Sequence, residues 1–238
     1  MTAAVVVAQR RQAPMTSAAA PLELDSGFGA LDGEALGLVE RRYGDRGLAV
    51  TRERYSSRNE AGDIVCTARD GERIVGTVSV RFDGPGGLHA DQLFCHELDD
   101  WRRAGVSLCE FGGLAVDRHS HDPKRVLAQI FHLGYLHAHR RAGCARLVIE
   151  VNPRHVPFYR RCLGLVPCTA ARHNPRVNAP AVLMSIDFAT VREQIALWGG
   201  HPGSVAAARN LYPLAWDEAT EATMLARLAP AAPRRVNA

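Results

Sequence analysis

The stretch that decides the fold is Leu147–Pro167, which reads LVIEVNPRHVPFYRRCLGLVP. Its first five residues are mostly β-branched or apolar, and Asn152-Pro153 follows as a turn signal, so the sequence predicts a strand that stops abruptly. A short helix should come next and end at Gly164. Asn, His and Tyr side chains at the end of a strand favour a site for acyl transfer. The alternative is an ordinary strand–turn–helix corner with a buried Tyr.

The segments before this stretch predict a long helix and a broken strand. Asp122-Pro123 supplies an N-cap and a first helical residue, and an apolar stripe continues to about Arg141. The preceding run, residues 106–116, reads as a strand interrupted by Gly112-Gly113, which indicates a bulge or the close approach of a ligand or backbone. Strand, helix and strand in this order predict a right-handed βαβ unit with a parallel pair.

A hairpin is expected earlier in the chain. Residues 64–68 and 73–82 are rich in β-branched side chains, and Asp70-Gly71 joins them. The second run is apolar on both faces for part of its length, which places it inside the sheet. The remaining predicted elements are helices near 34–43, 97–103 and 190–198, a strand at 181–187, an amphipathic segment at 216–228 and an ambiguous extended segment at 49–57.

Length and composition indicate one α/β domain with extensions. The 238 residues are 47% hydrophobic, which is enough for a sizeable core without disulfide staples. We predict a mobile N-terminal tail over residues 1–29, a domain over 30–198, and a partly helical C-terminal extension over 199–238.

Charge and cysteine content limit the partners and the compartment. The net charge of +4 suits an acidic partner or a plain solvated surface. Six scattered cysteines without a C-x-x-C pair indicate neither a disulfide framework nor a cysteine zinc site, so we expect a cytoplasmic protein. The histidines lack metal-ligand spacing, and we expect no metal, no nucleic acid and no membrane span.

The order of these elements resembles the superfamily of GCN5-related N-acyltransferases. The resemblance implies a mixed α/β sheet, flanked by helices, whose two central parallel strands splay apart beside the bulge. The acyl thioester would lie in that opening, where a backbone N–H polarises its carbonyl. The residues that the resemblance places there are Gly112, Gly113, Leu114 and Ala115.

One feature of that superfamily is missing. Acetyltransferases that use coenzyme A usually carry the loop R/Q-x-x-G-x-G/A, whose amides hold pyrophosphate at the start of the long helix. The corresponding segment here, RHSHDPKRV at residues 118–126, contains no glycine. A coenzyme A-dependent N-acetyltransferase is therefore the alternative function, although Lys124 and Arg125 offer side chains for a phosphate.

A closer resemblance is to the long-chain N-acyl amino acid synthases, relatives of the acyl-homoserine lactone synthases. It is carried by EFGGLAVD at 110–117, VNPRHVPFYRRCLG at 151–164 and VNAPAVL at 177–183, and covers roughly residues 39–188. The family transfers a fatty acyl chain from the phosphopantetheine arm of acyl carrier protein to the α-amino group of an amino acid. No tightly bound cofactor is implied. A third possibility is a catalytically silent module that binds acyl chains or the carrier.

The expected catalytic residues follow from this chemistry. An ammonium nucleophile must lose a proton, and Glu110 beside the bulge is our candidate base, the alternative being a carboxylate in a salt bridge. Tyr159 would protonate the leaving thiolate, as in some relatives, or else pack in the core. His155 is a site residue or a hydrogen-bonding residue at the helix start.

The expected binding residues lie on the same elements. Asn152 would orient the pantetheine amides or the turn itself. Arg154 would bind the carboxylate of the amino acid through its guanidinium fork, unless a carboxylate of the protein occupies it. His132 is expected on the helix surface. The side chains proposed to steer the acidic carrier, or else to form solvated helix faces, are Lys124, Arg125, Arg140, Arg141, Arg160 and Arg161.

Overall fold

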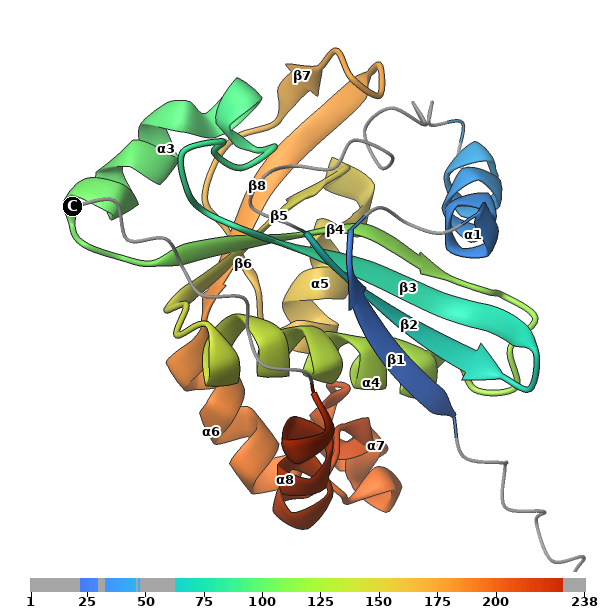
Figure 1. Ribbon diagram of the computed structural model, residues 1–238. Helices are drawn as coiled ribbons and strands as arrows, with labels where there is room; N and C mark the ends of the chain where they lie inside the picture. The colour runs from blue at the N-terminus through green and yellow to red at the C-terminus, as the bar shows by residue number, and fades with distance from the viewer. Residues whose placement is uncertain (1–21, 30–32, 46, 48–62, 229–238) are drawn as a thin grey trace, which may run out of the picture.

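A mixed sheet forms the frame of the structure, a computed structural model that describes residues 22–29, 33–45, 47 and 63–228. Its strands lie in the order β1-β2-β3-β4-β5-β8-β6, and β7 pairs with β8 off this path (Figure 1). The strands are β1 (Glu23–Phe28), β2 (Ile64–Asp70), β3 (Arg73–Phe82), β4 (Leu108–Val116), β5 (Arg146–Val151), β6 (Val166–Pro167), β7 (Arg172–Asn174) and β8 (Ala179–Asp187).

Helices cover both faces of this sheet (Figure 1). One face, which we call the α3 face, packs against α1 (Gly33–Gly44) and α3 (Asp91–Arg103). The other, the α4 face, packs against α4, α5, α6 and the C-terminal segments. These are α4 (Pro123–Tyr135), its π-helical continuation η1 (Leu136–Arg141), α5 (Val156–Leu163), α6 (Phe188–Trp198), α7 (Val205–Ala208) and α8 (Glu218–Arg227), with short 3₁₀ turns η2 (Pro153–His155), η3 (Pro202–Ser204) and η4 (Tyr212–Leu214).

The central strands alternate their side chains between the two cores. Leu108 belongs to the core beneath α3, whereas Cys109 belongs to the core beneath α4. Successive side chains of a strand point to opposite faces, so Glu110 lies on the α3 face and Phe111 on the α4 face. This alternation places a carboxylate and an aromatic ring on opposite sides of the sheet at neighbouring positions.

The two central strands part after a short parallel ladder. β4 and β5 pair at Leu108–Arg146, Cys109–Leu147 and Glu110–Val148. Beyond this point β4 continues against β3, and β5 continues against β8. The splayed parallel pair expected from the sequence is therefore confirmed.

A bulge in β4 lies next to the parting point. The register with β3 passes from Ser79–Gly112 to Thr77–Ala115, so two residues of β4, Gly113 and Leu114, face Val78. Gly113 has a φ of 58°, a left-handed conformation that glycine adopts without a steric penalty. The adjacent glycines of the sequence therefore mark a true bulge.

Most predicted elements are confirmed with small changes at their ends. The hairpin of β2 and β3 turns at Asp70–Arg73, β3 lies inside the sheet, and α5 ends at Gly164 with a φ of 78°. The helix expected at 97–103 starts earlier, at Asp91. The last turn of the long helix is π-helical. The segment 49–57 lies outside the described residues.

The predicted N-terminal tail is wrong over its last part. Glu23–Phe28 forms β1 and pairs with β2 along six residues, and residues 1–21 lie outside the described part. Leu22 and Leu24 pack against the α4-face core. A strand with Asp, Ser and Gly in its middle has low intrinsic β propensity, so pairing with β2 rather than local preference determines its structure.

Two further observations concern the whole chain. All six cysteines are free thiols. In the described part of the chain, no helix has both the length and the apolar character that crossing a bilayer requires.

Candidate active site

The site predicted from the sequence lies where β4 and β5 part. Glu110 is the last residue of β4 in the ladder, and Gly112–Ala115 form the bulge that follows. Asn152 comes directly after the end of β5. The structure therefore brings the two sequence blocks together at one point of the sheet.

Glu110 is held on the α3 face. Glu110 is only 2% exposed, and its Oε2 accepts a hydrogen bond from the backbone N–H of Ala90 over 3.1 Å. Arg81 stands directly opposite Glu110 in the register of β3 and β4, and it is also buried. Arg81 donates a hydrogen bond to Asp63 over 2.9 Å. A buried carboxylate thus has a buried arginine as its cross-strand neighbour.

A second carboxylate lies on the same face. Glu150 is two residues beyond Val148, which pairs with Glu110, so Glu110 and Glu150 occupy diagonal positions on neighbouring strands. Glu150 forms an ion pair with Arg176 and accepts a hydrogen bond from Nδ2 of Asn174 over 3.3 Å. Arg176 also donates to the carbonyl of His89 over 2.8 Å.

These observations define a polar cluster, formed by Arg81, Glu110, Glu150, Asn174 and Arg176. Its charges of both signs match an amino acid, which carries an ammonium and a carboxylate. Sequence reasoning found only Glu110 of this set. The signal for Arg81 and Glu150 is a single charge within an otherwise apolar strand, whereas Arg176 follows a short strand that the sequence did not predict.

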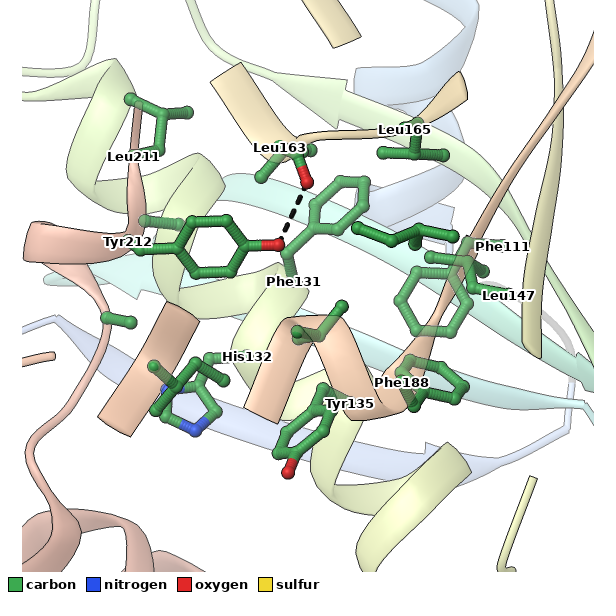
Figure 2. Close-up of a pocket in the computed structure, with 15 residues that line it drawn as sticks. Phe111, Phe131, His132, Tyr135, Leu147, Leu163, Leu165, Phe188, Leu211 and Tyr212 are labelled. Carbon is green, nitrogen blue, oxygen red and sulfur yellow. Dashed lines mark hydrogen bonds between the residues drawn. The ribbon is translucent and has the colours of Figure 1, made fainter. Parts of the chain in front are cut away.

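An apolar cavity lies on the opposite face of the sheet (Figure 2). Phe111 and Leu147 border it at the parting point, Phe131 and Tyr135 come from α4, and Phe188 comes from α6. The ring of Phe111 packs against Phe131 with centroids 5.6 Å apart. Apolar side chains surround this cavity on nearly all sides, an environment that suits hydrocarbon groups.

Hydrogen bonds within the Asn-Pro-Arg-His corner help to fix its shape. Oδ1 of Asn152 accepts from the backbone N–H of Arg154 over 3.2 Å, which caps η2. Nε of Arg154 donates to Nε2 of His155 over 3.2 Å, and the Arg154 residue is exposed. Of the two roles considered for Asn152, the structure shows the capping of the turn.

Tyr159 lies on α5, on the other side of the sheet from Glu110. Its half-buried side chain packs against the α4-face core. Its ring meets that of Phe158 edge-on, with centroids 5.4 Å apart. The two candidate proton-transfer groups, Glu110 and Tyr159, therefore lie on opposite faces of the sheet.

The start of α4 is already occupied by protein groups. Oδ1 of Asp122 accepts from the backbone N–H of Arg125 over 3.0 Å, and Pro123 at the first helical position has no N–H to offer. A negative carboxylate therefore sits where the helix N-terminus would otherwise attract phosphate.

The basic residues divide into two groups. Lys124, Arg160 and Arg161 are exposed, and Arg125 is partly exposed. Burial raises the pKa of the Cys162 thiol on α5, and the positive charges of Arg161 and Lys124 oppose this rise. The four residues Lys124, Arg125, Arg160 and Arg161 form what we call the basic patch.

The second group serves a structural role. Arg140 forms an ion pair with Glu221, and Nη1 of Arg141 donates to the carbonyl of Leu228 over 2.8 Å. His132 is not on the helix surface, as expected from the sequence, but 2% exposed and in contact with Glu221 and Trp216. The C-terminal extension covers this part of α4, and its partner residues lie too far along the chain for helical periodicity to reveal.

No group of three or more His, Cys, Asp or Glu side chains with the arrangement of a metal site occurs among the described residues.

A family model and a solved structure both relate this chain to one family of enzymes. The family model of the N-acyl amino acid synthase FeeM matches residues 34–187. The solved structure of FeeM, an N-acyl amino acid synthase from uncultured soil microbes, is 26% identical and has a TM-score of 0.63, with 72% of this chain and 94% of that chain covered. A search of curated protein sequences finds no match.

Two more distant structures share less with the chain. The AHL synthase LasI is 14% identical with a TM-score of 0.49, covering 70% of this chain and 90% of that chain. An acyl-CoA N-acyltransferase from Pseudomonas aeruginosa is 11% identical with a TM-score of 0.44, covering 69% and 99%. The family assignment rests on neither. Because the family match covers more than half of this chain, the chain belongs to the FeeM family of N-acyl amino acid synthases and is an N-acyltransferase.

Proposed function

We propose that this N-acyltransferase moves a long-chain fatty acyl group from acyl carrier protein to the α-amino group of an amino acid. The observation that carries the proposal is the arrangement at the parting point of β4 and β5. A charged cluster lies on one face of the sheet, and an apolar cavity lies on the other. An amphiphilic product needs both environments next to one reacting carbon.

The donor would place its thioester where the strands part. The acyl chain would enter the apolar cavity on the side lined by Phe111, which lies two residues before Gly113 of the bulge. The backbone of Gly112, Gly113, Leu114 and Ala115 would polarise the thioester carbonyl, because a bulge turns amide groups away from the ladder.

The acceptor would bind on the α3 face. Its ammonium would meet Glu110, and its carboxylate would bind an arginine, for which Arg154 is our first candidate and Arg81 the second. Arg81 is buried beside Glu110, whereas Arg154 is exposed at the end of β5. Asn152 and His155 would keep Arg154 in place through the hydrogen bonds of the corner.

The reaction then takes place in two balanced steps. Glu110 accepts a proton from the ammonium, directly or through water, and the free amine attacks the thioester carbon. The C–N bond forms, the C–S bond breaks, and Tyr159 gives its proton to the departing thiolate. The nitrogen loses its second proton as the amide forms, and this proton restores the Tyr159 hydroxyl, directly or through water, while the proton on Glu110 passes to solvent. Since Glu110 and Tyr159 lie on opposite faces, the nucleophile enters from one side of the sheet as the leaving group departs on the other.

The start of α4 supports acyl carrier protein rather than coenzyme A as the donor. Asp122 and Pro123 occupy the position where amides would bind a pyrophosphate. The basic patch on α4 and α5 suits the acidic surface of a carrier protein instead. We propose a cytoplasmic location, because the six free thiols fit a reducing compartment.

The test compares donors directly. Purified protein is incubated with a mixture of amino acids and either a fatty acyl-carrier protein or the matching acyl-coenzyme A, and the products are identified by mass spectrometry. We expect N-acyl amino acids from the carrier-bound donor, with a much lower rate from the coenzyme A ester. Products formed only from acetyl-coenzyme A would show an N-acetyltransferase and would contradict the proposal.

A further inference from the structure

The C-terminal extension forms one wall of the apolar cavity. The family match ends at Asp187, so residues from Gly199 onward lie outside it. Leu211, Tyr212 and Ala215 of this extension nevertheless line the cavity, across from the side at Phe111 (Figure 2). The cavity is thus bounded at one end by the shared fold and at the other by a segment that the family match does not include.

Side-chain contacts fix this wall against α4. Nδ1 of His132 accepts a hydrogen bond from the backbone N–H of Trp216 over 3.1 Å. The other ring nitrogen, Nε2, therefore carries the proton and donates to Glu221 over 3.0 Å. Arg140 completes the contact through its ion pair with Glu221. One buried histidine thus anchors the extension at two points.

Backbone contacts fix the same wall against α5. The N–H of Leu211 donates to the carbonyl of Cys162 over 2.9 Å. The hydroxyl of Tyr212 donates to the carbonyl of Leu163 over 2.8 Å (Figure 2). At Gly199 an added Cβ would lie only 2.5 Å from the carbonyl oxygen of Trp216, so the close packing of the extension admits only glycine there. The wall is a fixed boundary.

The ring of Tyr212 forms part of the cavity wall. Tyr212 is only 8% exposed, and burial raises the pKa of its hydroxyl, which stays protonated and bonded to Leu163. Tyr212 lies across the cavity from Phe111, so its ring would face the far end of a chain that enters on that side (Figure 2).

We propose that the C-terminal extension sets the length of the acyl chain, and that Tyr212 is the residue against which the chain ends. This inference rests on the proposed function, because it assigns the cavity to the acyl group of the donor. Adding or removing one methylene in an apolar pocket changes selectivity by about 10–200-fold, so one side chain suffices to set a sharp limit.

The experiment uses two substitutions with opposite expected effects. Tyr212→Ala removes the ring and should extend the preferred acyl chain, with relative kcat/KM for donors two carbons longer rising by about tenfold or more. Ala215→Leu adds volume to the same wall and should shorten the preferred chain. Tyr212→Phe keeps the ring and should retain the wild-type preference. Each full-length variant receives mixed acyl-carrier donors of different lengths, and products are measured by mass spectrometry.

The outcomes separate the two proposals. A wild-type protein that yields no N-acyl amino acid from any donor contradicts the proposed function. If the wild type yields N-acyl amino acids, and Tyr212→Ala and Ala215→Leu both give its chain-length distribution, the inference is overturned while the proposed function stands. Thermal unfolding checks that each variant is folded, and if Tyr212→Ala does not fold, the shift expected from Ala215→Leu decides.

Discussion

The backbone N–H of Ala90 points at Oε2 of Glu110 and donates to it over 3.1 Å. Ala90 lies just before α3, 20 residues from Glu110 in sequence, so the loop after β3 orients the carboxylate from above the sheet. The loop therefore helps to position the proposed base.

The first prediction concerns this base. Glu110→Gln keeps the shape and can no longer accept the proton, so kcat should fall by about 10²–10⁴-fold, the usual contribution of general base catalysis. Binding of the acyl carrier should be retained, as measured by calorimetry. Glu193→Gln, an exposed change on α6, is the matched control. Normal turnover by Glu110→Gln would remove Glu110 from the mechanism. Loss of turnover with retained carrier binding would exclude a catalytically silent binding module.

The second prediction concerns the carboxylate of the acceptor. Arg154→Lys replaces a fork by a single ammonium, so the KM for the amino acid should rise about tenfold while kcat is retained, since a hydrogen bond to a charged partner contributes about 1.5–3 kcal/mol. Arg118→Lys is a closely matched control, because Arg118 also donates from Nε to the neighbouring His119, over 3.0 Å. An unchanged KM in Arg154→Lys would contradict this role for Arg154 and make Arg81 the candidate that binds the carboxylate.

The third prediction concerns the carrier protein. Reversing two charges of the basic patch, Lys124→Glu with Arg161→Glu, should raise the KM for the acyl-carrier donor by about tenfold or more. The wild-type KM should itself rise with salt, because screening weakens attraction between exposed charges beyond about 10 Å at 0.1 M. Arg227→Glu on α8 is the control. If the double variant and the control have the same KM for the acyl-carrier donor, the carrier binds outside the basic patch.

The fourth prediction concerns pH and the anchoring histidine. Burial lowers the pKa of His132, against the opposing effect of Glu221, so the unfolded chain binds a proton more readily than the folded one. The contribution of neutral His132 to the free energy of unfolding is therefore fully present above about pH 6.5. It is lost as the pH falls through the pKa of His132 in the folded protein, which is lower. His137 acts in the same direction, because burial lowers its pKa to about 4.

Thermal unfolding across this pH range checks the sign. His132→Asn cannot titrate, so its Tm should fall less than that of the wild type between pH 7 and pH 5, with His121→Asn on the exposed loop as the control. Burial alone would raise the pKa of Glu221, but His132 and Arg140 lower it, so its contribution is lost only at more acidic pH. Parallel pH profiles for wild type and His132→Asn would contradict the assignment.

The fifth prediction concerns packing beside the cavity. A Cβ at Gly134 would lie 2.8 Å from the ring of Phe111, so Gly134→Ala must displace that ring. Overpacking costs about 1–3 kcal/mol, which outweighs the gain of about 1 kcal/mol in helix propensity. We expect a lower free energy of unfolding in urea and reduced activity. In contrast, Gly37→Ala in α1 meets only a flexible arginine at 3.4 Å and should stabilise the protein.

The sequence predicts those features that depend on local chemistry. Adjacent glycines in β4 mark the bulge, Asp70-Gly71 marks the hairpin, and Asn152-Pro153 marks the end of β5. Each is a backbone requirement that particular residue types satisfy, so a reader of the sequence can find it.

The features that the sequence did not predict depend on distant partners. His132 bonds to Glu221, 89 positions away, and no periodicity within α4 reveals a partner at that distance. Glu150 and Arg176 are 26 residues apart and meet only because β7 and β8 fold back onto β5. β1 was missed because its pairing with β2, rather than its composition, makes it a strand.

The position of the C-terminal extension also bears on how the protein should be handled. If the chain were shortened at Asp187, where the family match stops, the apolar surfaces of Phe131, Tyr135 and Leu163 would lose the cover that Leu211, Tyr212 and Trp216 now give them. An exposed apolar surface of that kind promotes self-association. Side-by-side assays with FeeM therefore call for protein that retains its residues at least as far as Leu228.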